Sequence, residues 1–423
     1  MPKNIVEVNY LYFFCKRDRR PRGTRETGQR MRGDPALPFR VAAMRKVCLL
    51  GGGKIGLLAA GLLVRSGDYR VVVGDRDDHA LASLHHHFPS SDLTTVSLDA
   101  ARGDALDRCL RAHEIDAVVS TLPYHHTGGV ASAAHRLNVH YFDVTEDVAV
   151  TRHVRALAHG ASAAFVPQCG LAPGFVSIVA NHVMQRFQRI DTVKMRVGAL
   201  PINPSHALKY SLTWSTDGLI NEYGNPCQAI EGGRLVEPLP LEGYETITLD
   251  GVLYEAFNTS GGLGTLAESY QGRVQSMSYK TLRYPGHCEK IRLLMIDLKL
   301  NDDRPTLKRI LENAVPQTVQ DVVLIYVSVS GLRDGDLVEE SYVKKVYPAY
   351  LDGRRWSAVQ ITTAAGLCAV VDIVLQHPDT YHGFICQEAF SLAEILHNRF
   401  GRLYEETFRR STDPQGDRLA GVD

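Results

Sequence analysis

Three glycines in G-x-G-x-x-G spacing constrain the fold of this chain more than any other feature. Gly51, Gly53 and Gly56 follow an apolar run at residues 47–50, and an apolar helical pattern continues over residues 57–65. The short run is typical of a strand buried on both faces. In this arrangement the glycines permit a tight turn, close approach of a pyrophosphate and close packing of the helix on the sheet. The stretch therefore predicts a dinucleotide site, with a ligand-free structural turn as the alternative.

An acidic residue supports this interpretation and bears on the choice of cofactor. A second apolar run, residues 69–73, leads to Asp75, about twenty residues beyond the glycines. A carboxylate in this position accepts hydrogen bonds from a ribose hydroxyl and repels a 2′-phosphate. We therefore expect NAD as the cofactor, while Arg65 and Arg76 keep NADP as an alternative.

Helices and strands continue to alternate as far as residue 170. Further strands are expected at "TTVSL", "DAVVST", "VHYFDV" and "AAFVPQCG". In a doubly wound sheet, ligands lie outside the carboxyl ends of the strands. On these grounds the residues expected to contact the cofactor are Gly51, Gly53, Lys54, Ile55, Gly56, Asp75, Asp99, Ser120, Thr121, Leu122 and Pro123.

The pattern changes after residue 174, where longer runs such as "TVKMRVGAL" and "DVVLIYVSVSG" suggest a mixed or antiparallel sheet with one covered face. We expect an α/β protein with a Rossmann-type doubly wound parallel sheet and an inserted α+β substrate and oligomerisation domain. The Rossmann domain is predicted at residues 44–170 and the inserted domain at 171–357. Residues 358–423 are predicted to form C-terminal helices that return to the Rossmann domain, followed by a tail.

Residues 1–43 differ in composition from the rest of the chain. They include an arginine-rich stretch with Gly and Pro, and they lack apolar periodicity. Acidic residues are interspersed, and there is no apolar stretch followed by a cleavage site, unlike a targeting peptide. We expect either a disordered extension or a start assigned too early, with translation beginning at Met44.

Charge and cysteine content limit the classes of partner. The formal net charge is zero, which gives no indication of nucleic acid or an anionic membrane as a partner. The eight cysteines are scattered without a C-x-x-C pair or zinc spacing, so we expect reduced thiols, no metal and a cytoplasmic location. We identify no apolar run of the roughly 18 residues that a membrane helix needs, and we interpret the run near Thr362 as a core helix.

Several sequence blocks occur together in a fixed order. They are "PQCGLAPGF" (167–175), "VGALP" (197–201), "YSLTWSTDGLINEY" (210–223), "EAFNTSGGLGTL" (255–266) and "YKTLRYPGHCEKIRLL" (279–294). Together with "GGGKIG", these blocks resemble the saccharopine dehydrogenase family, and most closely its lysine 6-dehydrogenase branch. The resemblance implies nicotinamide-dependent oxidation or reduction at a carbon–nitrogen bond of an amino acid. It also implies a homodimer or a higher homo-oligomer.

The implied chemistry requires a base and a cation. Hydride loss from an amine needs the nitrogen lone pair, but a lysine ammonium has a pKa near 10.4, so a base or a desolvated site must act first. A carboxylate substrate suits the planar fork of arginine. In "SYKTLRYPGHCEK" we expect Arg283 to bind the carboxylate, His287 to act as acid, base or orienting group, and Lys280 to be a further catalytic candidate. A surface loop with a structural Arg–Glu pair is the alternative.

Five further residues complete the predicted site. Asp143, at the end of the fifth strand, is expected to hold the substrate ammonium. Trp214, Asp217, Tyr223 and Ser260 are expected to bind substrate. The structural alternatives are a core tryptophan, a turn acid that caps the next helix, and a glycine-rich hairpin around Ser260.

The expected reaction is oxidation of L-lysine at its ε-carbon, giving 2-aminoadipate 6-semialdehyde and ammonia. Saccharopine dehydrogenase activity is the first alternative, because one more cation, from Lys280 or Arg196, would bind the additional dicarboxylate. A carboxyspermidine-type dehydrogenase and a non-enzymatic NAD-binding protein are further alternatives.

Overall fold

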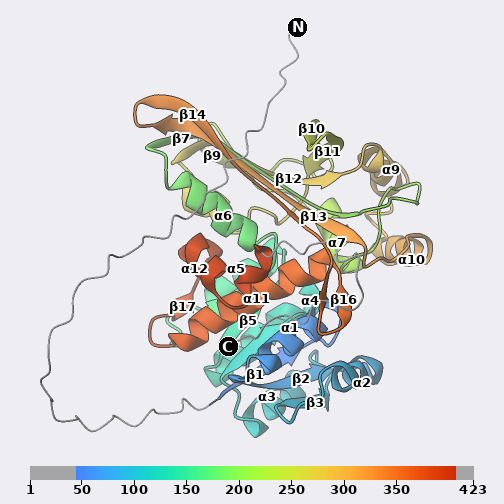
Figure 1. Ribbon diagram of the computed structural model, residues 1–423, viewed down its shortest axis with the longest axis vertical. Helices are drawn as coiled ribbons and strands as arrows, with labels where there is room; N and C mark the ends of the chain where they lie inside the picture. The colour runs from blue at the N-terminus through green and yellow to red at the C-terminus, as the bar shows by residue number, and fades with distance from the viewer. Residues whose placement is uncertain (1–43, 406–423) are drawn as a thin grey trace, which may run out of the picture. The chain divides into compact units, whose positions relative to one another are not determined.

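A parallel sheet is built mainly from the first part of the chain (Figure 1). Within residues 44–405, which the computed structural model describes, this sheet has seven strands in the order β17-β6-β5-β4-β1-β2-β3. The order reverses between β1 and β4, as expected of a doubly wound sheet. The strands are β1 (Arg45–Leu50), β2 (Tyr69–Asp75), β3 (Leu93–Ser97), β4 (Ala117–Ser120), β5 (His140–Asp143), β6 (Ala164–Val166) and β17 (Gly383–Phe384). The predicted N-terminal extension, residues 1–43, and the tail from residue 406 lie outside the described residues.

Strand β1 is buried on both faces, as its apolar run predicts. Val47 and Leu49 belong to one hydrophobic core, and Cys48 and Leu50 belong to the other. The alternation follows from the two-residue period of a strand. The connecting helices are α1 (Lys54–Arg65), α2 (Asp78–His87), α3 (Gly103–Ala112), α4 (Tyr124–Leu137) and α5 (Val148–Leu157).

A second, mixed sheet follows. Its main path is β10-β11-β12-β7-β13-β14; β12 and β7 are parallel and the other neighbours on this path are antiparallel. Helix α6 (Phe175–Met184) packs on β7, β13 and β14 (Figure 1). The strands are β7 (Arg189–Pro201), β8 (Ala229–Glu231), β9 (Arg234–Val236), β10 (Glu245–Leu249), β11 (Val252–Asn258), β12 (Val274–Arg283), β13 (Asp321–Arg333) and β14 (Asp336–Val346).

Further elements lie between and after these strands. They are α7 (Thr216–Gly224), α8 (Leu266–Tyr270), α9 (His287–Arg292), the π-helical turn η1 (Leu293–Asp297), α10 (Arg304–Ala314), β15 (Ala349–Leu351), β16 (Arg354–Trp356), η2 (Gln387–Ala389), α12 (Leu392–His397) and η3 (Gly401–Tyr404). Among them, β15 and β16 pair with each other as a separate two-stranded sheet.

Helix α11 (Ala358–Gln376) returns to the first sheet and packs against α1. In the described part of the chain it is the one helix that is long and apolar enough to cross a membrane, by length and composition alone. The expectation that no apolar run reaches this length is therefore wrong. However, 94% of its apolar window is buried inside the protein, so a role as a core helix explains its composition.

We predict that Gly56→Ala lowers the thermal unfolding temperature. A Cβ at Gly56 would lie 1.8 Å from the carbonyl oxygen of Gly51, and backbone atoms in a tight turn cannot move aside. Overpacking of this kind costs about 1–3 kcal/mol of unfolding free energy. Gly53→Ala is the matched control, because a Cβ there meets no atom within 4 Å. Calorimetry that finds equal melting temperatures for the two variants would contradict the prediction.

Candidate active site

A cavity of about 600 Å³ lies between the carboxyl ends of the parallel strands and the second sheet. Its volume is within the range of about 300–1,000 Å³ typical of small-molecule sites. Its walls are formed by Gly53, Lys54, Ile55, Thr121, Leu122, Pro123, Tyr124, Val144, Thr145, Glu146, Gly170, Leu171, Ala172, Val197, Ala199, Leu212, Trp214, Ser215, Thr216, Asp217, Gly218, Glu222, Tyr279, Thr281, Arg283, Glu312, Gln317, Val359 and Thr363.

The glycine turn at one end of the cavity can accept a dinucleotide phosphate. No side chain caps the N-terminus of α1, so N–H groups of its first turn are available. Gly53 lines the cavity, and a Cβ there would enter open space. Six of the predicted cofactor residues lie on the cavity wall: Gly53, Lys54, Ile55, Thr121, Leu122 and Pro123.

The other predicted cofactor residues lie off the cavity wall. Gly51 and Gly56 pack against each other and shape the turn. Asp75 Oδ2 accepts a hydrogen bond from the backbone N–H of Gly52 at 2.6 Å, beside the turn. Asp99 Oδ1 accepts from the backbone N–H of Ala101, within its own loop.

Ser120 is a correction to the predicted cofactor contacts. Its side chain is buried, and its Oγ lies 3.3 Å from the Oγ1 of Thr127 on α4. The next residue, Thr121, reaches the turn instead: its Oγ1 donates to the carbonyls of Leu50 and Gly51. Because successive residues of a strand point to opposite faces, only one of the two can face the turn.

At the other end of the cavity Arg283 is 3% exposed and firmly held. Its Nε donates to the Tyr223 hydroxyl at 2.8 Å, and its Nη1 donates to Thr281 Oγ1 at 2.6 Å and to the Leu282 carbonyl at 2.9 Å. The guanidinium also lies over the Tyr210 ring, 5.0 Å from its centroid. Among the described residues, Nη2 has no hydrogen-bond partner and is therefore available to a ligand.

His287 orients this arginine indirectly. Its Nδ1 lies 2.8 Å from the Leu208 carbonyl, which can only accept, so Nδ1 carries the proton. Its Nε2 then accepts from the Tyr223 hydroxyl at 3.0 Å, and Tyr223 in turn accepts from Arg283. Burial, with the charge of Arg283, lowers the pKa of His287 to about 3. His287 and Tyr223 lie off the cavity wall. The geometry therefore favours the orienting role expected for His287 over the role of acid or base.

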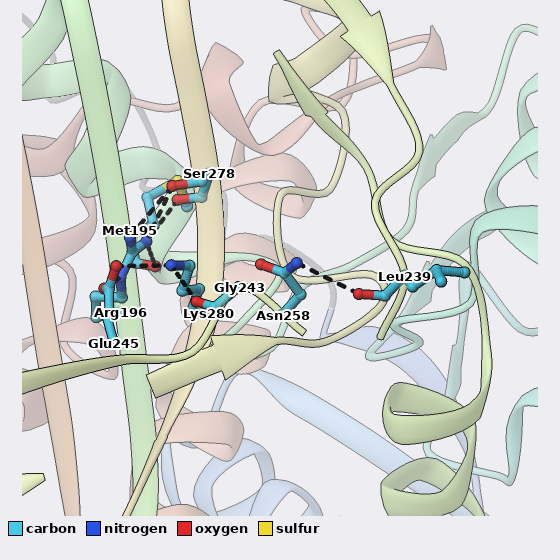
Figure 2. A network of polar contacts seen from close by, with 8 residues as sticks. All are labelled: Met195, Arg196, Leu239, Gly243, Glu245, Asn258, Ser278 and Lys280. Carbon is cyan, nitrogen blue, oxygen red and sulfur yellow. Dashed lines mark hydrogen bonds and ion pairs between the residues drawn. The ribbon is translucent and has the colours of Figure 1, made fainter. Parts of the chain in front are cut away.

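Lys280 is a further correction to the predicted site (Figure 2). Its Nζ donates to Glu245 Oε2 and to the Gly243 carbonyl, both at 2.6 Å, and Glu245 also accepts from Arg196. Lys280 and Arg196 are register partners on β12 and β7, so they share one face of the sheet. Arg283 is an odd number of residues from Lys280 and lies on the opposite face, which lines the cavity. Neither Lys280 nor Arg196 therefore reaches the cavity.

Asp143 is another correction to the predicted site. Its carboxylate is fully buried and accepts from the Tyr141 hydroxyl at 2.5 Å and from the N–H groups of Thr145 and Gln168 at 3.0 and 2.9 Å. Burial raises the pKa of Asp143 to about 6, against these hydrogen bonds. With its oxygens engaged and off the cavity wall, Asp143 fixes the backbone after β5. Glu146, three residues later, lines the cavity instead.

Glu146 and Glu222 are the residues that the sequence prediction missed. They are 9% and 8% exposed, and both line the cavity. Burial raises the pKa of Glu146 to about 7 and that of Glu222 to about 8. Helical spacing could have identified Glu222, because it lies four residues after Gly218, which also lines the cavity on α7.

The predicted substrate residues Trp214 and Asp217 lie on the cavity wall. Trp214 packs against Gly218, and its Nε1 donates to the Tyr210 hydroxyl at 3.2 Å. Asp217 forms an ion pair with Lys308 at 2.6 Å. The side chain that caps α7 is Ser215, so the alternative of Asp217 as the helix cap is wrong.

Ser260 is buried off the cavity wall and has a supporting role. Its N–H donates to the Glu222 carbonyl at 2.9 Å, and its Oγ donates to the Pro226 carbonyl at 2.8 Å. A Cβ on the next residue, Gly261, would lie 2.2 Å from the Glu146 carbonyl oxygen. The loop therefore holds the segments that carry Glu146 and Glu222. Direct substrate binding by Ser260 is a further correction.

No cluster of three or more His, Cys, Asp or Glu suited to a metal ion occurs within residues 44–405.

Comparisons with known proteins agree with this architecture. The family model described as the saccharopine dehydrogenase NADP binding domain matches residues 47–166, and the saccharopine dehydrogenase C-terminal domain matches residues 170–407. Saccharopine dehydrogenase [NADP(+), L-glutamate-forming] of Schizosaccharomyces pombe is 22% identical over 362 residues, 79% of each chain. The solved structure of apo saccharopine dehydrogenase (L-Glu forming) from Saccharomyces cerevisiae has a TM-score of 0.68 and 17% identity. That match covers 83% of this chain and 95% of the yeast chain.

We predict that raising the pH destabilises the protein through its buried carboxyls. A group whose pKa is higher in the folded state binds more protons there, so its stabilising effect is lost as pH rises through the folded pKa. For Glu222 this window ends at about pH 8. Between about pH 6 and pH 9, Glu222→Gln should therefore lose less thermal stability than the unmodified protein. Equal slopes of melting temperature against pH would contradict the prediction.

Proposed function

Because the chain belongs to the saccharopine dehydrogenase family and is thus a nicotinamide-dependent oxidoreductase acting on an amino-acid carbon–nitrogen bond, we propose that it is an L-lysine 6-dehydrogenase. In this reaction the ε-carbon of L-lysine is oxidised, and 2-aminoadipate 6-semialdehyde and ammonia are released. The observation that carries the proposal is the balance of charge on the cavity wall.

Within the part of the chain that the structure describes, the residues of the cavity wall include more carboxyl groups than cations. Its cations are Lys54 and Arg283, and its carboxyl residues are Glu146, Asp217, Glu222 and Glu312. Lysine has one carboxylate and two ammonium groups, so it needs one arginine, and the buried carboxyls Glu146 and Glu222 can accept hydrogen bonds from its ammonium groups. This match supports lysine as the substrate.

The same balance disfavours saccharopine, which has three carboxylates. The two cations that would bind the additional dicarboxylate, Lys280 and Arg196, lie on the other face of the sheet, where both contact Glu245 (Figure 2). Saccharopine oxidation stays the second candidate because the Schizosaccharomyces pombe relative is named for the L-glutamate-forming reaction.

The chain's own residues have separable roles in this proposal. Arg283 binds the α-carboxylate through its available Nη2, while Tyr223 and Thr281 hold the guanidinium in place. Trp214 contacts the aliphatic stem of lysine. The glycine turn, with Thr121 behind it, would hold the cofactor. A bound nicotinamide supplies the hydride acceptor for the ε-carbon.

We propose NAD as the preferred cofactor, although the matched domain and the fission-yeast relative are both named for NADP. The support is Asp75, whose two carboxylate oxygens accept from the N–H groups of Gly52 and Asp77 at 2.6 and 2.9 Å. These bonds fix a negative charge beside the glycine turn. A 2′-phosphate would be repelled there, whereas a ribose hydroxyl could donate to the carboxylate.

We predict that L-lysine supports NADH formation with release of ammonia, and that Arg283→Lys lowers kcat/KM for lysine about 10- to 100-fold. The estimate is the loss of charge-assisted hydrogen bonds worth about 1.5–3 kcal/mol. Cadaverine, which lacks the carboxylate, is the matched control, and its slower oxidation should be little affected by the substitution. Saccharopine is assayed in parallel with glutamate as readout. Turnover of saccharopine alone would refute the lysine proposal.

We also predict that Asp75→Ser raises the KM for NAD and lowers the KM for NADP, because the substitution removes the charge that repels the 2′-phosphate. Steady-state titration of both cofactors measures the change. Asp78→Ser, which alters an exposed acid three residues later, should leave both values unchanged. A clear preference of the unmodified protein for NADP would contradict the role given to Asp75.

A further inference from the structure

The Glu222 carboxyl combines burial with the absence of any partner. It lies on α7, is 8% exposed and lines the cavity. Among the described residues no side chain or backbone group is hydrogen-bonded to its carboxyl oxygens. Buried polar groups normally have a hydrogen-bond partner, because an unpaired one loses its hydration without compensation. The Glu222 oxygens are not among the fully buried, unpartnered atoms of the described residues, so they reach the cavity and are available to a ligand.

The other cavity carboxyls are already engaged. Glu146 Oε1 accepts from the Asn221 amide at 3.2 Å, and Asp217 pairs with Lys308. Glu312 is exposed to solvent. Of the four carboxyls on the wall, Glu222 is thus the buried one with no hydrogen bond to either oxygen.

The groups around Glu222 have opposite effects on the ionisation of its carboxyl. Burial and the nearby Glu146 favour its protonated form, while Arg283 favours the carboxylate. A general base works best when its pKa lies near the working pH, and burial raises the pKa of Glu222 to about 8. The titratable groups that interact with it are Tyr223 on the same helix and, from neighbouring segments, Glu146, Tyr210, Cys227, Tyr279 and Arg283.

We propose that Glu222 is the catalytic base that deprotonates the substrate ammonium before hydride transfer. An N–H bond of the ammonium breaks, the proton moves to a carboxyl oxygen of Glu222, and the electron pair stays on nitrogen. That lone pair forms the C=N bond as the hydride leaves the ε-carbon for the nicotinamide cofactor, so the amine is oxidised and the cofactor is reduced. The inference rests on the proposed function for the identity of the amine.

The glycine loop around Ser260 is a positioning element for this base. The N–H of Ser260 donates to the Glu222 carbonyl, and Gly261 lies directly against the backbone of Glu146. The base and the neighbouring carboxyl are therefore held by one segment, which itself lies off the cavity wall.

The test is the pH profile of kcat/KM for Glu222→Gln, which keeps the size of the side chain but cannot accept the proton. We expect a fall of about 10²- to 10⁴-fold and loss of the rising limb that the unmodified enzyme shows near its base pKa, with NADH binding retained. Glu222→Asp, which keeps a carboxyl, should recover part of the activity. Glu289→Gln, an exposed site in the "YPGHCEK" block, is the matched control and should keep the parent profile. An unchanged profile in Glu222→Gln would overturn the proposal.

A second measurement does not depend on turnover. Difference infrared spectroscopy of the ligand-free protein between about pH 6 and pH 9 should show a protonated carboxyl band that titrates and is missing in Glu222→Gln. The absence of such a band in the unmodified protein would also overturn the proposal. If saccharopine rather than lysine is turned over, the lysine assignment fails, but the same pH profile still tests Glu222 because a secondary ammonium must also lose a proton.

Discussion

The cavity depends on a buried carboxylate at the start of α11. Asp321, at the first position of β13, is fully buried, and its oxygens accept from the N–H groups of Ala358 and Val359 at 2.6 and 3.1 Å. Two residues along, the Gln360 amide donates to the carbonyl of Lys54, the first residue of α1. The second sheet and the nucleotide-binding helix are thus tied to the same helix end. Since the walls of the cavity belong to these two parts, the contacts at this helix end fix their separation.

The two faces of the second sheet have different chemical environments. On one face, Arg283 adjoins aromatic rings and the buried cavity carboxyls. On the other face, Arg196 and Lys280 share Glu245, whose single carboxylate offsets part of their charge (Figure 2). The sheet backbone between them keeps the second set of charges away from the substrate. Of the three cations Arg196, Lys280 and Arg283, Arg283 alone is therefore available to a ligand in the cavity.

The sequence predicts the glycine turn, the parallel sheet and the mixed second sheet, because each depends on local periodicity and turn chemistry. The two-residue period of a strand also places Lys280 and Arg283 on opposite faces. Which face lines the cavity depends on packing between segments distant in the chain, and the sequence contains no local signal for it. The burial of His287 against Leu208 depends on a contact across 79 residues and could not be predicted for the same reason. The role of Glu222 depends on its being unpaired, which is a property of the folded neighbourhood.

The glycine loop at residues 260–264 packs directly behind two residues of the cavity wall. Gly261 touches the carbonyl of Glu146, and a Cβ on Gly262 would lie 2.2 Å from the Tyr279 ring. Any larger residue at either position would act as a spacer and push its neighbour outward. Substitution at Gly261 or Gly262 therefore displaces Glu146 or Tyr279, and both of these residues line the cavity. A loop that lies off the cavity wall can in this way change the shape of the cavity without any change to the residues that line it.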